Sequence, residues 1–343
     1  MTERFDELVF FGRFCPFHKG HLRVIEKGLE QADRVLVLVG SVDQPRDIRT
    51  PFSFEERAQM IRASLSAADR DRVVIRSMAD WVYNDQSWIR QVQELVAAEV
   101  APKPLSEAKV ALIGAARGGS NYFRKFFPQW GAVQVQPLAD VEATPLRMSY
   151  LLDDFAEWSK RYGAQLPEPV FTLLQAFAGS EAHQALSDEA RFIAEYRKGW
   201  ADAPHAPIFV TVNAVVIQSG HVLMLKRRAL PGKGLLALPG GFIGERERLK
   251  PAMLRVLREE ARIKVPAPVL EGSIFMNRVF DDPWRSARGR TIAHVFGLEL
   301  KPDPEGLPKL RNSDAAWIPL AELKPLTIFE DHWHIINAAL GEI

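Results

Sequence analysis

The chain has 343 residues, of which 47% are hydrophobic and 25% charged, an ordinary composition for a folded protein of about two domains. Its 44 Lys and Arg residues almost balance its 43 Asp and Glu residues, so the charge favours neither nucleic acid nor an anionic membrane as a partner. The single cysteine excludes an internal disulfide, and because the sequence has no leader pattern and no apolar run of about 18 residues, we expect a cytoplasmic protein.

The first predicted elements are a strand at Leu8–Phe11 and an amphipathic helix over residues 22–32, joined by a turn that begins at Gly12. His18 and His21 therefore lie at a helix N-terminus, where unpaired backbone N–H groups and the helix dipole favour a bound anion. The two imidazoles are three residues apart, so they share one face and add donors aimed at the same anion. This stretch is a candidate phosphate site.

From Leu8 to Tyr150, apolar runs alternate with amphipathic segments, which predicts parallel strands joined by crossover helices in a doubly wound α/β sheet. Ligands of such sheets bind beyond the carboxyl ends of the strands, where the turn at Gly12 lies. Ser53 and Glu56 form a capping box that starts one of the helices. The candidate strands are Leu8–Phe11, Val35–Val39, Val73–Arg76, Val110–Ile113 and Val133–Gln136.

Three later segments of this half carry groups suited to a nucleotide. Arg49 lies in a basic loop, and a guanidinium fits phosphate oxygens, although a solvated loop has the same composition. Residues 79–88 combine aromatic rings with Asn84, which suits a flat carboxamide ring as well as it suits a protein core. Thr144 and the proline after it open a helix that contains Arg147.

Residues 12–21, Gly-Arg-Phe-x-Pro-Phe-His-x-Gly-His, resemble the nucleotidyltransferase superfamily with a His-x-Gly-His signature, in the form found in archaeal-type nicotinamide mononucleotide (NMN) adenylyltransferases. The resemblance includes the Arg-x-Pro-Phe segment at 49–52, Tyr-Asn-Asp-x-x-Trp at 83–88 and Thr-x-x-Arg at 144–147. The chain departs at Cys15, where the family often has Gln, and at 115–118, where it often has His-x-Lys-Asp.

This resemblance implies a Rossmann-like domain that transfers AMP from ATP to NMN, giving NAD and pyrophosphate, with Mg²⁺ or another divalent cation on the ATP oxygens. Catalysis would consist of positioning and electrostatic stabilisation. The catalytic residues would be His18, His21, Arg147 and Thr144. ATP would bind at Gly12, Arg13, Phe14, Gly20 and Arg117, and NMN at Arg49, Tyr83, Asn84, Asp85 and Trp88.

The remaining chain predicts a connector and a second domain. Helical patterns and the Ala- and Pro-rich stretch ADAPHAP fill the connector, so we expect domains at 1–162 and 208–343 with a connector at 163–207. At the start of the second domain, two apolar runs flank Ser219-Gly220, which predicts a hairpin.

Residues 241–263 resemble the Nudix box, G-x5-E-x7-R-E-U-x-E-E-x-G-U, where U is a bulky aliphatic residue. Val256 and Arg262 stand where the box has Glu and Gly. The resemblance implies an α/β/α Nudix domain that takes ADP-ribose, and residues 278–294 resemble proteins that fuse an NMN adenylyltransferase to an ADP-ribose pyrophosphatase. Its pocket would contain Gly240, Gly241, Arg255, Arg285, Arg288 and Arg290, and its metal ligands would be Glu247, Glu259 and Glu260.

Valine cannot coordinate Mg²⁺, so at this point the second domain either hydrolyses ADP-ribose weakly or only binds it. Two alternatives stay open: a Nudix-like module that senses NAD or ADP-ribose and regulates the first domain, and a His-x-Gly-His transferase with another acceptor, such as phosphopantetheine. The expected partners are the small molecules ATP, NMN and ADP-ribose. The sequence leaves homo-oligomer formation and the choice between NMN and its nicotinic acid form open.

Overall fold

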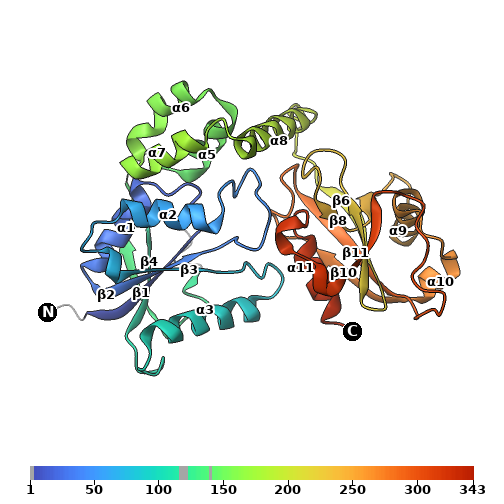
Figure 1. Ribbon diagram of the computed structural model, residues 1–343, viewed down its shortest axis with the longest axis horizontal. Coiled ribbons are helices and arrows are strands. Elements are labelled where there is room, and N and C mark those ends of the chain that lie inside the picture. Colours follow the sequence, from blue (N-terminus) through green and yellow to red (C-terminus); the bar gives the residue numbers. More distant parts are fainter. Residues whose placement is uncertain (1–3, 116–122, 139–140) are drawn as a thin grey trace. The chain divides into compact units, whose positions relative to one another are not determined.

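A computed structural model describes residues 4–115, 123–138 and 141–343 (Figure 1). The chain divides into two units, Met1–Ala190 and Arg191–Ile343, each with its own sheet. The boundary lies inside the segment 163–207 that the sequence predicts as a connector. No helix within the described ranges is long and apolar enough to cross a membrane.

The first unit is built on a parallel sheet of five strands in the order β3-β2-β1-β4-β5. The predicted doubly wound sheet is confirmed, and each candidate strand overlaps an observed one. Because β1 lies between β2 and β4, the chain reverses its direction across the sheet at the carboxyl end of β1, where such folds bind ligands. The strands are β1 (Phe5–Gly12), β2 (Ala32–Val39), β3 (Val73–Ser77), β4 (Val110–Ala115) and β5 (Gly131–Val135).

Helices cover both faces of this sheet, with α1 and α2 on one side and α3 on the other (Figure 1). The predicted capping box is confirmed: the Ser53 backbone N–H donates to Glu56 Oε2 over 2.8 Å, and the Glu56 N–H donates to Ser53 Oγ over 3.3 Å. The helices of this unit are α1 (Lys19–Leu29), α2 (Phe54–Ser64), α3 (Asp85–Val100), α5 (Ala143–Leu152), α6 (Phe155–Tyr162) and α7 (Glu168–Phe177). Helix α8 (Glu181–Lys198) contains the boundary between the two units. Short 3-10 turns occur at Arg70–Arg72 and Gly163–Gln165.

The second unit contains a mixed sheet of seven strands in which β11 pairs with β6 in parallel and the other neighbours are antiparallel. The predicted hairpin is confirmed, since β6 and β7 are joined by Ser219 and Gly220, both with positive φ (+47° and +72°). The strands are β6 (Phe209–Gln218), β7 (His221–Lys226), β8 (Leu236–Ala237), β9 (Gly240–Phe242), β10 (Ile274–Phe280), β11 (Thr291–Glu299) and β12 (Ala315–Pro319).

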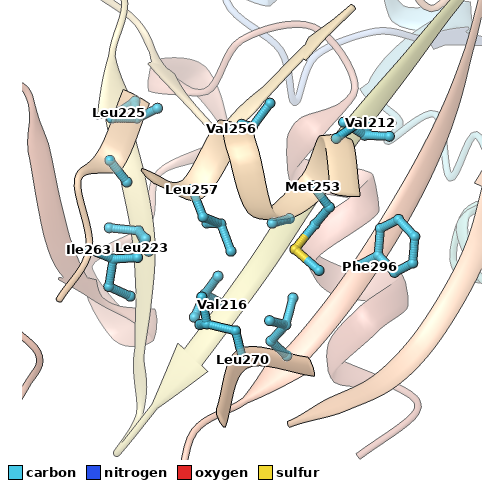
Figure 2. Packing of buried hydrophobic residues seen from close by; sticks show 14 of the residues in the cluster. Val212, Val216, Leu223, Leu225, Met253, Val256, Leu257, Ile263, Leu270 and Phe296 are labelled. Atoms are coloured by element: carbon cyan, nitrogen blue, oxygen red, sulfur yellow. The ribbon is translucent and has the colours of Figure 1, made fainter. Parts of the chain in front are cut away.

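One face of this sheet packs under α9 (Leu249–Val256), which continues as a single π-helical turn over Leu257–Ala261. Figure 2 shows the apolar cluster below them, to which Val256 belongs with an exposed fraction of 2%. The π turn ends at Arg262, whose φ of +51° lies in the left-handed region that favours glycine. The remaining helices are α10 (Ala267–Gly272) and α11 (His332–Leu340), with 3-10 turns at Leu320–Glu322 and Pro325–Thr327.

Candidate active sites

The loop from Gly12 to His18 connects β1 to α1 at the point where the first sheet changes direction. Phe14 has a positive φ of +53° and folds its ring back over Gly12, where a Cβ atom would lie 2.7 Å from the Phe14 ring. The ring is 2% exposed and packs edge-on against the His21 imidazole, with 4.9 Å between centroids. This conformation requires the glycine, and it supports His21 from the protein core.

His18 and His21 cap each other at the start of α1. The His21 N–H donates to His18 Nδ1 and the His18 N–H donates to His21 Nδ1, each over 3.3 Å, and the rings stack with their centroids 3.6 Å apart. Because both Nδ1 atoms accept, a neutral ring must carry its proton on Nε2. The pair therefore offers two Nε2–H donors beside the free N–H groups of the helix N-terminus.

Both imidazoles are neutral at physiological pH. Burial lowers the pKa of His18 to about 4, and it lowers the pKa of His21 well below its usual range. The site therefore presents hydrogen-bond donors and the helix dipole to an anion, without full positive charge on the rings.

A cavity of about 240 Å³ opens next to these rings. Gly20 lies against it, and a Cβ atom there would come within 3.0 Å of the His18 ring, so glycine keeps room for the imidazole. The lining residues are Phe10, Phe11, His18, Gly20, His21, Val24, Leu112, Ile113, Gly114, Ala115, Phe123, Pro137, Leu138 and Val141.

Two buried guanidinium groups hold the loops around this cavity. Arg147 is 5% exposed, and it donates to the carbonyl oxygens of Cys15 (2.9 Å) and Ile48 (3.1 Å). It therefore joins the loop before α1 to the basic loop that contains Arg49. Thr144 stands exposed one turn earlier, in the first turn of α5.

Arg57, on α2, is 1% exposed and donates four hydrogen bonds to backbone carbonyl oxygens. Its acceptors are the carbonyls of Arg13 (3.0 Å), Gly40 (2.7 Å), Ser41 (3.1 Å) and Ser53 (3.1 Å). Carbonyl oxygens satisfy the donors without cancelling the charge, so Arg57 places a cation behind the loop and ties the end of β1 to the end of β2.

None of the residues predicted to hold NMN lines this cavity. Asn84 caps α3 by accepting from the Ser87 N–H over 3.0 Å. Trp88 belongs to an aromatic cluster, with 5.4 Å between its ring and that of Phe11 and 5.4 Å between its ring and that of Phe123. Both of those phenylalanines line the cavity, so Trp88 lies one ring away from it.

The second unit has a larger cavity of about 600 Å³. At its floor, a Cβ atom on Gly240 would lie 2.0 Å from Asn213 Nδ2, so only glycine fits there. The lining is rich in arginine, with side chains that suit a polyanion. The arginine, phenylalanine and glutamate residues of the lining are Arg227, Arg228, Phe242, Glu259, Glu260, Arg262, Arg285, Arg288, Arg311, Phe329 and Glu330.

Two of the Nudix-box carboxylates, Glu247 and Glu259, pair with Arg255. Glu247 accepts from Arg255 Nε (2.7 Å), Arg255 Nη2 (2.8 Å) and the Gly244 N–H (3.0 Å), and the hydrogen bonds from Arg255 lower the pKa of Glu247 to about 2. Arg255 also reaches Glu259 over 3.3 Å. In the ranges that the structure describes, no three His, Cys, Asp or Glu side chains are grouped to hold a metal ion.

Comparison with known proteins agrees with both halves of the chain. The family model of cytidylyltransferase-like proteins matches residues 9–150, and that of the NUDIX domain matches residues 207–339. The nicotinamide/nicotinic acid mononucleotide adenylyltransferase of Acinetobacter baylyi is 38% identical over 189 residues, which are 55% of this chain and 95% of that protein.

Two crystal structures of a bifunctional NMN adenylyltransferase/ADP-ribose pyrophosphatase from Francisella tularensis, one with AMP and a Mn ion, match almost the whole chain. Each is 34% identical and covers 98% of this chain and 99% of its own, with TM-scores of 0.90 and 0.91. The chain belongs to this bifunctional family. It is an NMN adenylyltransferase domain fused to a Nudix domain.

In the adenylyltransferase domain, the structure brings His18, Gly20 and His21 into one cavity, with Arg147 behind the loop that contains Gly12, Arg13 and Phe14. Arg117 and the adjacent Gly118 lie outside the described residues. Arg49, Tyr83 and Asp85 are not among the residues that line this cavity.

In the Nudix domain, Gly240, Gly241, Arg285 and Arg288 line the cavity as predicted. Arg255 and Arg290 differ from the prediction, because Arg255 pairs with Glu247 and Arg290 donates to the Asp281 carbonyl oxygen, and neither lines the cavity. Two residues could not be found from the sequence. Arg57 donates to backbone carbonyl oxygens, three of them far away in the sequence, and Glu330 belongs to no motif.

Proposed function

We propose that the first domain binds ATP at the His18–His21 pair and transfers its AMP to NMN. An oxygen of the NMN phosphate attacks the α-phosphorus, the bond from the α-phosphorus to the bridging oxygen breaks, and pyrophosphate leaves with the electron pair. The attacking oxygen is already anionic, so the enzyme needs neither a nucleophile nor a base of its own. The reciprocal cap at the reversal point of the sheet is the observation that carries this proposal.

Catalysis then consists of positioning and charge stabilisation. The two Nε2–H groups and the N-terminus of α1 would contact the ATP phosphates, and Thr144 and Arg147 would contact the departing pyrophosphate. Arg13 and Arg49 would bring the two anions together. ATP would arrive as its Mg²⁺ complex, and Mg²⁺ is our proposal for the divalent ion.

For NMN we propose binding at Arg49, Tyr83, Asn84, Asp85 and Trp88. The position of Trp88, one aromatic ring from the ATP cavity, supports a stacking role for its indole. We propose domain limits of 1–162 and 208–343; the family match at 9–150 lies inside the first domain, and the match at 207–339 begins one residue before the second. The cytoplasmic location stays a prediction.

For the second domain we propose binding of ADP-ribose, with hydrolysis that is slow or absent. The arginine-rich lining supports binding of a diphosphate. The ion pair of Glu247 with Arg255 and the apolar side chain of Val256 leave few oxygens for a metal ion. Glu259 and Glu260 are the remaining carboxylates of the box at the cavity.

The test is an assay of the full chain with ATP, Mg²⁺ and one acceptor at a time: NMN, its nicotinic acid form or phosphopantetheine. We expect NAD and pyrophosphate from NMN. Trp88→Ala should raise KM for NMN while KM for ATP stays the same, and Trp88→Phe should restore part of the loss. Turnover of phosphopantetheine without turnover of NMN would contradict the proposal. Release of AMP from ADP-ribose, measured separately, distinguishes hydrolysis from binding.

A further inference from the structure

The segment Phe329–His332 forms one wall of the Nudix cavity, and three of its four side chains are fixed by the protein. The Arg227 guanidinium lies 3.8 Å from the centre of the Phe329 ring. Asp331 accepts two hydrogen bonds of 2.9 Å from Arg285, in a pair that is almost fully buried. His332 Nδ1 accepts from the Leu238 N–H over 2.9 Å.

Glu330 is the exception in this wall. Its backbone has a φ of +48°, a conformation that costs energy for any residue with a Cβ atom. Its Oε1 is buried and has no hydrogen-bond partner among the described residues, and its Oε2 lies 3.8 Å from Arg288 Nη2, beyond hydrogen-bond range. Burial raises the pKa of Glu330 to about 7, although the charges of Arg288 and Arg285 and a hydrogen bond from Ser286 to its carboxyl group act in the opposite direction. The backbone at Glu330 is thus strained, and its carboxyl group has an acceptor atom, Oε1, without a hydrogen bond at the cavity.

A strained, incompletely paired side chain that persists in a rigid wall indicates a binding role, because packing alone would favour a glycine or an apolar residue at this position. Phosphate oxygens are acceptors and carry negative charge, so they do not pair with the ionised form of Glu330. The cavity supplies arginines for the phosphates, and the 43% exposed ring of Phe242 offers a flat apolar surface. What Oε1 lacks is a donor.

We propose that Glu330 accepts a hydrogen bond from an O–H or N–H donor in the nucleoside part of a nucleoside diphosphate bound in this cavity. The donor is a ribose hydroxyl or an exocyclic amine. This inference rests on the proposed role of the second domain as a nucleotide-binding domain. Glu330 would then distinguish ligands by whether they carry this hydrogen-bond donor, while the arginines would recognise the charge of the phosphates.

The experiment is calorimetric titration of the full chain with ADP, 2′-deoxy-ADP, 3′-deoxy-ADP and IDP in the presence of Mg²⁺. All proteins carry His18→Ala and His21→Ala, which weakens binding at the first domain. We expect one of the three analogues to bind about tenfold more weakly than ADP, the effect of losing one hydrogen bond to a charged group. The analogue that fails identifies the donor.

In the same background, Glu330→Ala should lower the affinity for ADP by about the same factor, and the variant should bind all four ligands with equal affinity. Glu330→Gln, which keeps an acceptor of the same shape, should restore part of the discrimination. Glu305→Ala, at an exposed loop position of the same domain, is the matched control and should leave the four affinities unchanged.

Thermal unfolding separates this role from a structural one. We expect Glu330→Ala to unfold at the same temperature as its parent or higher, since it removes a buried unpaired acceptor. A lower unfolding temperature with unchanged ADP affinity would make Glu330 a structural partner of Arg288 and overturn the inference, as would discrimination that survives in Glu330→Ala. If the parent binds none of the four ligands, nucleotide binding by the second domain is itself refuted.

Discussion

Val256 stands where the Nudix box that residues 241–263 resemble has Glu, and Val256→Glu tests whether a carboxylate at this position supports hydrolysis. The side chain is 2% exposed within the apolar cluster shown in Figure 2. Its Cγ2 lies 3.6 Å from the position that a Cβ atom on Gly241 would take, and Gly241 lines the cavity. The introduced carboxylate would therefore lie at the border between the core and the cavity.

The cost follows from this position. Removing the buried valine loses about 2 kcal/mol of hydrophobic stabilisation, and placing an unpaired carboxyl there costs about 1–3 kcal/mol more. We therefore expect the variant to lose about 3–5 kcal/mol of unfolding free energy without metal. Mg²⁺ at about 100 times its dissociation constant should restore about 2.7 kcal/mol, because the ion would bind the introduced carboxylate together with Glu259 and Glu260.

The assay combines thermal unfolding with and without Mg²⁺ and release of AMP from ADP-ribose. Val256→Gln has the same shape without the charge, so it should be destabilised and should not respond to Mg²⁺. We expect Val256→Glu to respond to Mg²⁺ and to hydrolyse ADP-ribose faster than the natural chain. If the Glu and Gln variants respond equally to Mg²⁺ and neither gains hydrolysis, the reasoning about this position is refuted.

Three further predictions concern stability and positioning. Arg57→Met should lower kcat for NAD synthesis about tenfold and cost about 3 kcal/mol of stability because buried carbonyls lose their donor, while the exposed Arg62→Met on the same helix changes neither. Because burial lowers the His18 pKa from 6.5 to about 4, only the unfolded chain gains a proton there as pH falls through that window. The contribution of His18 to the free energy of unfolding, measured by chemical unfolding, should therefore be about 2 kcal/mol smaller at pH 5 than at neutral pH, and His18→Asn should not show this loss. Arg262→Gly should stabilise the chain by about 1 kcal/mol, and Arg262→Ala should not, since only glycine relieves the φ of +51°; thermal unfolding of both variants tests this.

The sequence predicted the features that depend on local chemistry. Hydrophobic periodicity located the five strands, the spacing of Ser53 and Glu56 predicted the capping box, and the Ser219-Gly220 turn between two apolar runs predicted the hairpin. Each of these features depends on residues close in the chain. The strand-turn-helix context also placed His18 and His21 together at a helix start.

Contacts between distant segments could not be predicted in this way. Arg57 belongs to none of the motifs in the sequence, yet its guanidinium donates to carbonyl oxygens at the ends of two strands. Arg255 was expected in the pocket, but its ion pair with Glu247 directs it elsewhere. Glu330 depends on a left-handed backbone and on a cavity wall that forms only when the sheet and α11 assemble. Burial and partner choice of this kind arise from tertiary packing.

The proposed transfer of AMP depends most directly on the two imidazoles at the start of α1. We would measure NAD formation from ATP and NMN by the full chain carrying His18→Ala and His21→Ala, beside His205→Ala, which changes an exposed histidine far along the chain. We predict that the double variant loses at least about 100-fold in kcat, consistent with the loss of two donors to the transition state, while His205→Ala keeps its rate. Undiminished NAD formation by the folded double variant would contradict the account.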